Sequence, residues 1–129
     1  MPNELNQPGV KDDSEKLRVF ELFLQYFPRA IRGVCAVSEF GARKYVKGGW
    51  KSVPYAHDRY SNALIRHLLD EQVSPNDSDS QLHHDLHVAW NALARAEIRL
   101  RIEEENHNKV MLSNYGGETI VEGETDGPI

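Results

Sequence analysis

Apolar residues recur at intervals of three and four along most of the chain, a spacing that predicts amphipathic helices. In the first stretch, Leu17, Phe20, Leu24 and Phe27 form one such stripe. We expect four helices, over residues 14–27, 28–47, 57–72 and 80–106. The valine and isoleucine near residue 120 form too short a run to found a sheet. The predicted fold class is therefore all-α, resembling a four-helix bundle.

Turn-forming residues separate the predicted helices. A glycine pair stands at 48–49, and residues 74–80 are all Ser, Pro, Asn or Asp. Asp79 or Ser80 is expected to cap the last helix, because short side-chain oxygens accept hydrogen bonds from the free amides of a helix start.

The length of 129 residues suits one domain with a single core. Residues 1–12 are polar and interrupted by proline and glycine, so we expect a flexible N-terminal segment there. Residues 13–110 are expected to form the one helical domain. Residues 111–129 offer little apolar surface to offset chain entropy, which predicts a mobile C-terminal tail.

The charge balance limits the classes of partner. Fifteen Lys and Arg against 20 Asp and Glu give a net charge of -5, which argues against a DNA or RNA polymer or an acidic membrane as the partner. The single cysteine, Cys35, precludes an intramolecular disulfide and suits a reducing compartment. The chain begins without the basic and apolar runs of a signal peptide, and no later run is long enough to span a bilayer. We therefore expect a cytoplasmic protein.

The segment 84–91 has the most distinctive polar pattern in the sequence. At about 100° per residue, His84, His87 and Asn91 share one face of a helix. The opposite face carries leucines at 82, 86, 93 and 100, and we expect that face to be buried. The imidazoles would then line a site, although exposed polar residues near a helix start are the simpler alternative. For His83 we expect only that simpler role.

Several short motifs follow one another in an order that is typical of one enzyme family. They are Glu39-Phe40-Gly41-Ala42-Arg43-Lys44-Tyr45, Trp50, Arg66-His67-Leu68-Leu69, Asp77, Asp79-Ser80 and His84-x-x-His87-x-x-Trp90-Asn91. Over roughly residues 16–100, this order resembles the dATP/dGTP diphosphohydrolase family, which is common in phages and similar to the MazG-like pyrophosphohydrolases.

The resemblance implies the fold of the all-α NTP pyrophosphohydrolases and a metal-dependent reaction. That reaction cleaves purine deoxynucleoside triphosphates, dATP or dGTP, to a monophosphate and pyrophosphate. MazG-like enzymes bind metal through an E-E-x-x-E cluster and a later E-x-x-D pair. Here Glu39 has no close acidic neighbours, and histidines occupy the second position.

Candidate site residues follow from this resemblance and from the needs of phosphoryl chemistry. Catalytic roles are expected for Glu39, His84 and His87. The expected metal ligands are Glu39, His67, Asp77, Asp79, His84 and His87. Such a set indicates a divalent ion, with manganese or magnesium first and cobalt, iron or zinc as alternatives that imidazoles favour.

Four further residues are candidates for binding the substrate. Lys44 and Arg66 suit phosphate contacts, and Asn91 suits orientation of a phosphate oxygen or the attacking water. Trp50 suits stacking on a purine. Because a small bundle cannot bury every apolar stripe, we also expect a homo-oligomer, a dimer or tetramer.

Structural roles remain open for the same residues. Glu39 and Arg43 are spaced i, i+4 as a solvated ion pair, and His67 is spaced to be held by the carboxylate of Glu71. Asp77 and Asp79 suit turns and helix caps, and Trp90 suits the core as well as a site.

Two other functions remain open as well. A noncatalytic nucleotide-sensing or partner-binding protein on the same fold is the second hypothesis, because carboxylates near Glu39 are sparse. An HD-type phosphohydrolase, built on His67 and His84-Asp85, requires a further helical aspartate, and only Asp126 follows.

Overall fold

A computed structural model describes residues 7–114 of the chain, with side chains through residue 111. The elements in order are the π-helix η2 (Phe20–Leu24), α1 (Pro28–Lys44), the 3₁₀-helix η3 (Gly49–Ser52), α2 (Ala56–Asp70) and α3 (His84–Asn114). Residues 7–114 contain no β-strand, and one isolated backbone bridge joins Asn76 to His83. The predicted all-α fold class is confirmed.

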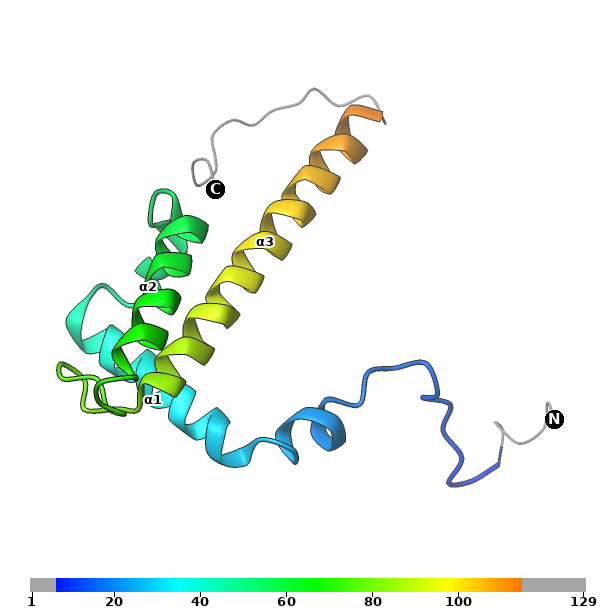
Figure 1. The fold of residues 1–129 in the computed structure, drawn as a ribbon. Helices are drawn as coiled ribbons and strands as arrows, with labels where there is room; N and C mark the ends of the chain where they lie inside the picture. Colours follow the sequence, from blue (N-terminus) through cyan, green and yellow to red (C-terminus); the bar gives the residue numbers. More distant parts are fainter. Residues whose placement is uncertain (1–6, 115–129) are drawn as a thin grey trace.

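The helices α1 and α2 both pack against the long helix α3. Figure 1 shows α2 running antiparallel to α3, with α1 packed near the beginning of α3. One stripe of α3 is buried along this interface: His84, His87, Asn91, Ala94 and Ile98. Their spacing of three and four residues is the spacing that keeps one helix face against a neighbouring helix. Three of these five side chains are polar, so the core and the candidate site occupy the same interface.

The expectation that the leucine face of α3 is buried is wrong for Leu93 and Leu100, while Leu82 and Leu86 are half-buried. Leu93 is 54% exposed and Leu100 is 61% exposed, whereas His84 is 4% exposed and His87 is 7% exposed. Burying these imidazoles is tolerated because each has a polar partner: His84 contacts His67 of α2, and His87 contacts Ser80 of the preceding loop. Leu86 is half-buried and lies against Gly33 of α1.

The predicted helix over residues 14–27 is largely wrong as well. Only Phe20–Leu24 is helical in that range, and it is a π-helix in which Gln25 N donates to Phe20 O at 3.0 Å. Figure 1 shows this segment extending away from the three long helices. Leu17 is 91% exposed and Phe20 is 64% exposed. A helix this short depends on packing of its apolar face, and within residues 7–114 this face is left exposed.

The two middle helices confirm the predictions over 28–47 and 57–72. Pro28 occupies the first turn of α1, where its missing amide hydrogen costs nothing. Gly33 lies against α3, since a Cβ there would lie 2.6 Å from Leu86 Cδ2. Gly48 has φ 76°, a left-handed conformation that glycine adopts freely, and it separates α1 from η3.

The last helix is longer than predicted and starts later. The amide of His84 donates to Pro75 O at 2.8 Å, so Asp79 and Ser80 lie in the preceding loop and do not cap α3. The helix continues to Asn114. Most of the predicted tail, residues 115–129, and residues 1–6 lie outside the described part of the chain. Within that part, no helix is long and apolar enough to cross a membrane.

Candidate metal centre

Two histidines from different helices meet in the core. His67, near the end of α2, and His84, at the start of α3, place their Nδ1 atoms 2.8 Å apart. Both side chains are buried, at 6% and 4% exposure. The ring of His67 also stacks on that of His87, with centroids 4.4 Å apart and 8° between the planes. Three imidazoles therefore form one compact cluster.

Asp77 brings a carboxylate from the loop between α2 and α3. Its Oδ1 lies 4.0 Å from His67 Nδ1, and its Oδ2 lies 4.0 Å from His87 Nε2. The same Oδ2 accepts hydrogen bonds from the amides of Asp79 and Ser80, at 3.1 and 2.8 Å. This Asx-type turn fixes the carboxylate beside the imidazoles.

The loop also presents a hydroxyl to the cluster. Ser80 Oγ lies 2.7 Å from His87 Nε2 and accepts a hydrogen bond from the amide of Leu82 at 3.1 Å. Gln81 adopts φ 67°, which allows the chain to turn back so that Leu82 O accepts from the amide of Asp77 at 2.8 Å. The prediction of Ser80 as a helix cap missed this contact. The Asp-x-x-Ser spacing was the available signal, since it is typical of such turns.

Burial sets the charge of these groups. Desolvation lowers the pKa of His67 to about 4, and it also lowers the pKa of His87. Desolvation opposes ionisation of Asp77, but the hydrogen bonds from Ser80 and the nearby imidazoles outweigh it, so the pKa of Asp77 is lowered. Near neutral pH the imidazoles of His67 and His87 are therefore neutral beside the ionised carboxylate of Asp77.

This donor set fits a divalent cation. One ligand atom from each of His67, Asp77 and His84 lies within 4.8 Å of the other two. Neighbouring ligands of an octahedral ion, at bond lengths of about 2.0–2.1 Å, lie about 2.9 Å apart. The separation of 2.8 Å between the two Nδ1 atoms agrees with that value. Neutral imidazole and ionised carboxylate are also the protonation states that bind metal.

The structure places three predicted ligands, Glu39, Asp79 and His87, outside this group of three. His87 stacks on His67, but its Nε2 lies 2.7 Å from Ser80 Oγ. Glu39 is exposed, and its Oε1 lies 3.8 Å from Arg43 Nη1 in the i, i+4 ion pair that its spacing also predicted. Asp79 pairs with Lys44 Nζ at 2.5 Å, and this hydrogen bond raises the pKa of Lys44. The carboxylate of Asp79 therefore links the loop to α1 at the edge of the cluster.

The alternative that the carboxylate of Glu71 holds the His67 side chain is wrong. Glu71 contacts His67 through a backbone hydrogen bond from its amide to His67 O at 3.0 Å. The imidazole faces His84 and Asp77 instead. Arg66 is exposed, and its charge contributes to lowering the pKa of His67. The guanidinium therefore acts electrostatically on the cluster from its rim.

The remaining predicted residues lie farther along α3 and beside it. Asn91 is 5% exposed, and its Nδ2 donates to His87 O at 2.8 Å, within the same helix. Trp50 packs edge-to-face against Trp90, with centroids 5.7 Å apart. Phe40 of α1 packs edge-to-face against His87, with centroids 6.4 Å apart. The polar cluster is thus bordered by aromatic rings.

One comparison with known proteins identifies a family. A family model described as dATP/dGTP diphosphohydrolase, N-terminal, matches residues 6–108. Among curated proteins and solved structures, no match is found. The matched range covers most of the chain and includes every residue of the histidine and aspartate cluster.

Proposed function

The chain belongs to the dATP/dGTP diphosphohydrolase N-terminal family, and from this premise we propose that it is a metal-dependent hydrolase of purine deoxynucleoside triphosphates. The products would be a deoxynucleoside monophosphate and pyrophosphate. The observation that carries the proposal is the buried group of His67, Asp77 and His84, whose ligand atoms lie within 4.8 Å of one another.

The proposed metal is held by His67, His84 and Asp77. A divalent cation bound there supplies positive charge to the phosphate oxygens and lowers the pKa of bound water. Manganese or magnesium is proposed, and the two imidazoles also suit cobalt, iron or zinc. His87 and Glu39 are proposed as further catalytic groups. His87 is suited to accept and return a proton, because its Nε2 lies within hydrogen-bond distance of Ser80 Oγ, at 2.7 Å.

Cationic groups border the cluster where a triphosphate would enter. Lys44 lies beside the loop through Asp79, and Arg66 is exposed next to His67. We propose that both contact phosphate oxygens, Arg66 through its planar fork and Lys44 as a point charge. Asp79 keeps Lys44 near the cluster until an anion competes for it. Asn91 is proposed to position His87 rather than substrate, since its amide donates to His87 O.

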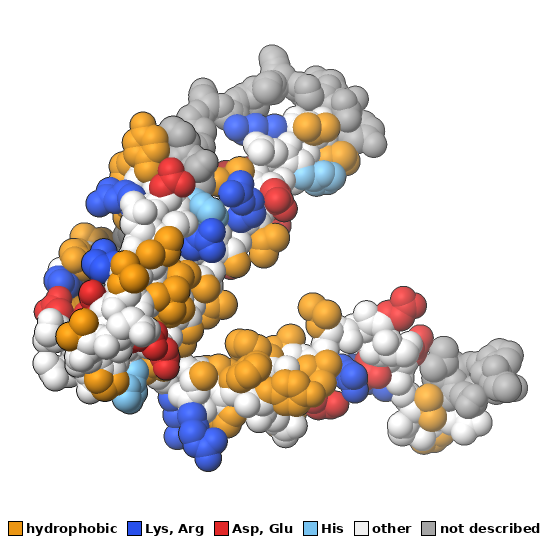
Figure 2. All heavy atoms as spheres, in the orientation of Figure 1, with side chains coloured by type: hydrophobic (Ala, Val, Ile, Leu, Met, Phe, Trp, Pro, Cys, Tyr) orange, Lys and Arg blue, Asp and Glu red, His pale blue; other side chains and the backbone are white. Residues whose placement is uncertain are grey.

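We also propose that the protein is a homo-oligomer and that it acts in the cytoplasm. The exposed apolar side chains of residues 17–27 support association, and Figure 2 shows hydrophobic side chains gathered along this extended segment. A segment of this kind is most stable when another chain covers it.

Product analysis tests the reaction. Purified protein is incubated with each of the eight common NTPs and dNTPs, separately with magnesium, manganese and cobalt, and products are resolved by anion-exchange chromatography. Monophosphate and pyrophosphate from dATP or dGTP support the proposal. Orthophosphate as the first product, or turnover of no nucleotide with any metal, contradicts it.

A noncatalytic nucleotide-binding protein is the second candidate function. The observation in its favour is that Glu39 is exposed and paired with Arg43, away from the three clustered ligands. Nucleotide binding without turnover in the product assay would support this function.

A further inference from the structure

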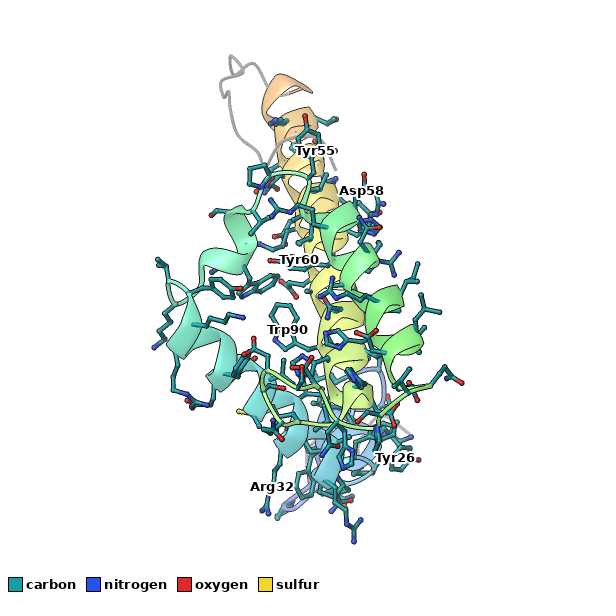
Figure 3. All side chains as sticks on the ribbon, turned by 60° about the vertical axis from the view of Figure 1, so that its left-hand side comes forward. Tyr26, Arg32, Tyr55, Asp58, Tyr60 and Trp90 are labelled. Carbon is teal, nitrogen blue, oxygen red and sulfur yellow. The ribbon has the colours of Figure 1, made fainter. Side chains whose placement is uncertain are left out.

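A groove of about 740 Å³ lies along α3, on the side that faces α1 and η3. Its apolar lining consists of Val34, Trp50, Trp90, Leu93 and Ala94. Figure 3 shows Trp90 and Tyr60 projecting into the opening between α3 and the segment formed by α1 and η3. Both tryptophans are only half-buried and Leu93 is exposed, so the rest of residues 7–114 leaves this apolar surface incompletely covered.

The aromatic rings of the groove offer apolar surface rather than polar atoms. Trp90 Nε1 donates to Ser38 Oγ and Tyr60 Oη donates to Trp50 O, each at 2.8 Å. Trp90 also packs edge-to-face against both Trp50 and Tyr60, with centroids 5.7 and 5.6 Å apart. A surface of this kind fits hydrophobic side chains of a partner.

The same chain carries a segment with a matching surface. Phe20, Phe23 and Phe27 follow one another at helical spacing and form what we call the aromatic ridge. The rings of Phe23 and Phe27 pack edge-to-face, with centroids 5.8 Å apart. Figure 1 shows the segment extending away from the three long helices, and Figure 2 shows hydrophobic side chains gathered along it. The ridge is therefore free to meet another molecule.

The edges of the two surfaces are complementary in charge. Glu97 and Arg101 lie one helical turn apart at the edge of the groove, and among the residues with described side chains neither forms an ion pair of 4.0 Å or less. Arg18 and Glu21, beside the aromatic ridge, pair with each other at 3.4 Å. Each surface thus presents one charge of each sign to the other, which favours a defined orientation.

We infer that the aromatic ridge of one copy of the chain docks in the α3 groove of a second copy, and that the exchange is reciprocal. The inference rests on the proposed homo-oligomer and adds the surface that receives the segment. Reciprocal docking closes as a dimer, because each copy gives one segment and receives one.

The area available suits a stable dimer. Phe20, Phe23 and Phe27 are 64%, 43% and 47% exposed. At about 150–250 Å² for a fully buried aromatic side chain, the three rings offer about 300 Å² per copy. Counted with the groove surface that they cover, and on both copies, reciprocal docking buries about 1,200 Å² in total, where stable interfaces begin. Leu17 and Leu24 continue the same spacing and are exposed, so they add to this area.

Two leucines on one stripe of α3 provide a matched test. Leu93 lines the groove, whereas Leu100, two helical turns later, does not. Both are exposed, so Leu93→Glu and Leu100→Glu should fold equally well, which circular dichroism checks. The mass of full-length wild type and of each variant is measured by light scattering over a dilution series. Tryptophan emission is recorded on the same samples, because both tryptophans of the chain line the groove.

We expect Leu93→Glu to raise the Kd of the dimer about 100-fold or more, because each dimer loses two buried leucines and places two charges in apolar grooves. Leu100→Glu should dissociate as the wild type does. Dilution of the wild type should shift tryptophan emission to longer wavelength as the ridge leaves the indoles exposed to water. Phe20→Ser combined with Phe23→Ser should show the longer wavelength at concentrations where the wild type is associated.

Two results would overturn the inference while leaving the homo-oligomer in place: equal dimer Kd values for Leu93→Glu and Leu100→Glu, or association of the wild type without a change in tryptophan emission. A wild-type mass of one chain at every concentration would reject both the groove and the homo-oligomer. The product assay is independent of these outcomes, since it tests the reaction alone.

Discussion

The Nδ1 atoms of His67 and His84 lie 2.8 Å apart in the core, although the two residues belong to different helices. At this distance one Nδ1 donates a hydrogen and the other accepts it. A cation bound by both nitrogens would replace that shared hydrogen. The pair therefore holds the site ready for metal while satisfying its own buried nitrogen atoms.

Replacing one member of this pair should reduce metal affinity. We predict that His84→Gln raises the Kd for Mn²⁺ at least about tenfold, because one of three clustered ligand atoms is lost. Isothermal titration calorimetry on metal-free protein at pH 7.5 measures this change.

The neighbouring histidine provides the matched control. His83 is exposed and adjacent in sequence, so His83→Gln should bind Mn²⁺ with wild-type affinity. If the two variants bound the ion equally well, the assignment of His84 as a ligand would be rejected.

Acid should destabilise the metal-free fold. Burial lowers the pKa of His67 to about 4 from an ordinary value of 6.5, so between these values the unfolded chain binds a proton that the folded chain does not. The stabilisation from neutral His67 is fully present above about pH 6.5 and is lost as the pH falls toward 4. We expect Tm in EDTA to decrease from pH 7 to pH 4.5.

A variant without the titrating imidazole separates this effect from that of other groups. His67→Gln should show a smaller decrease in Tm over the same pH range, with the remaining slope arising partly from His87, whose pKa burial also lowers. Parallel slopes for the two proteins in differential scanning fluorimetry would contradict the assignment.

Most helix positions could be predicted because they depend on local sequence. The apolar spacing and the breaks at Pro28 and Gly48 are local signals, and α1 and α2 formed where these signals placed them. The segment around Phe20 carries the same spacing, but only a π-helix forms because its apolar side chains are left exposed by the rest of residues 7–114. Periodicity identifies an amphipathic stretch without identifying its packing partner.

The orientation of α3 illustrates the same limit at the site. The shared face of His84, His87 and Asn91 was predictable from helix geometry, but its burial was not. That burial depends on His67, 17 residues before His84 in the sequence, and on a loop whose turn at Gln81 requires φ 67°. Contacts between distant residues decide which face is inside, and no local pattern of leucines reveals them.

Alanine substitutions at two glycines of α1 should affect stability differently. Gly41→Ala should raise the free energy of unfolding by about 0.5–1 kcal/mol, because nothing lies within 4 Å of the added Cβ and alanine favours the helix. Gly33→Ala should be about 1–3 kcal/mol less stable than Gly41→Ala, because Leu86 must move away from the new methyl group.

Urea denaturation measures both glycine variants. In a Leu86→Ala background the obstacle is removed, so Gly33→Ala should then stabilise the protein. Equal stabilities for Gly33→Ala and Gly41→Ala in the otherwise wild-type chain would show that α1 and α3 do not pack closely at Gly33.

Substitution of Glu39 tests whether this residue takes part in catalysis. Its side chain is 69% exposed and pairs with Arg43, so Glu39→Gln should change Tm little, an exposed ion pair being worth about 0.2–1 kcal/mol. If Glu39 is catalytic, kcat for dGTP or dATP should fall about 100-fold or more. Arg43→Gln breaks the same ion pair and should retain most activity. Equal losses of kcat in both variants would assign Glu39 a structural role.

The extended N-terminal segment should hold copies of the chain together. The buried hydrophobic residues of the described chain are Val37, Ala56, Ala94 and Ile98, whereas Phe20 is 64% exposed and Phe23 is 43% exposed. We expect multi-angle light scattering at micromolar concentration to give a mass that is a multiple of 14.7 kDa, for a dimer or tetramer. Phe20→Ser combined with Phe23→Ser should weaken association about 100-fold or more, because burying each ring contributes about 1.5–3 kcal/mol.

Val73→Ser, at a 91% exposed loop position, provides the control and should leave the mass unchanged. A wild-type mass of one chain, or equal dissociation in all variants, would show that the phenylalanines serve another purpose.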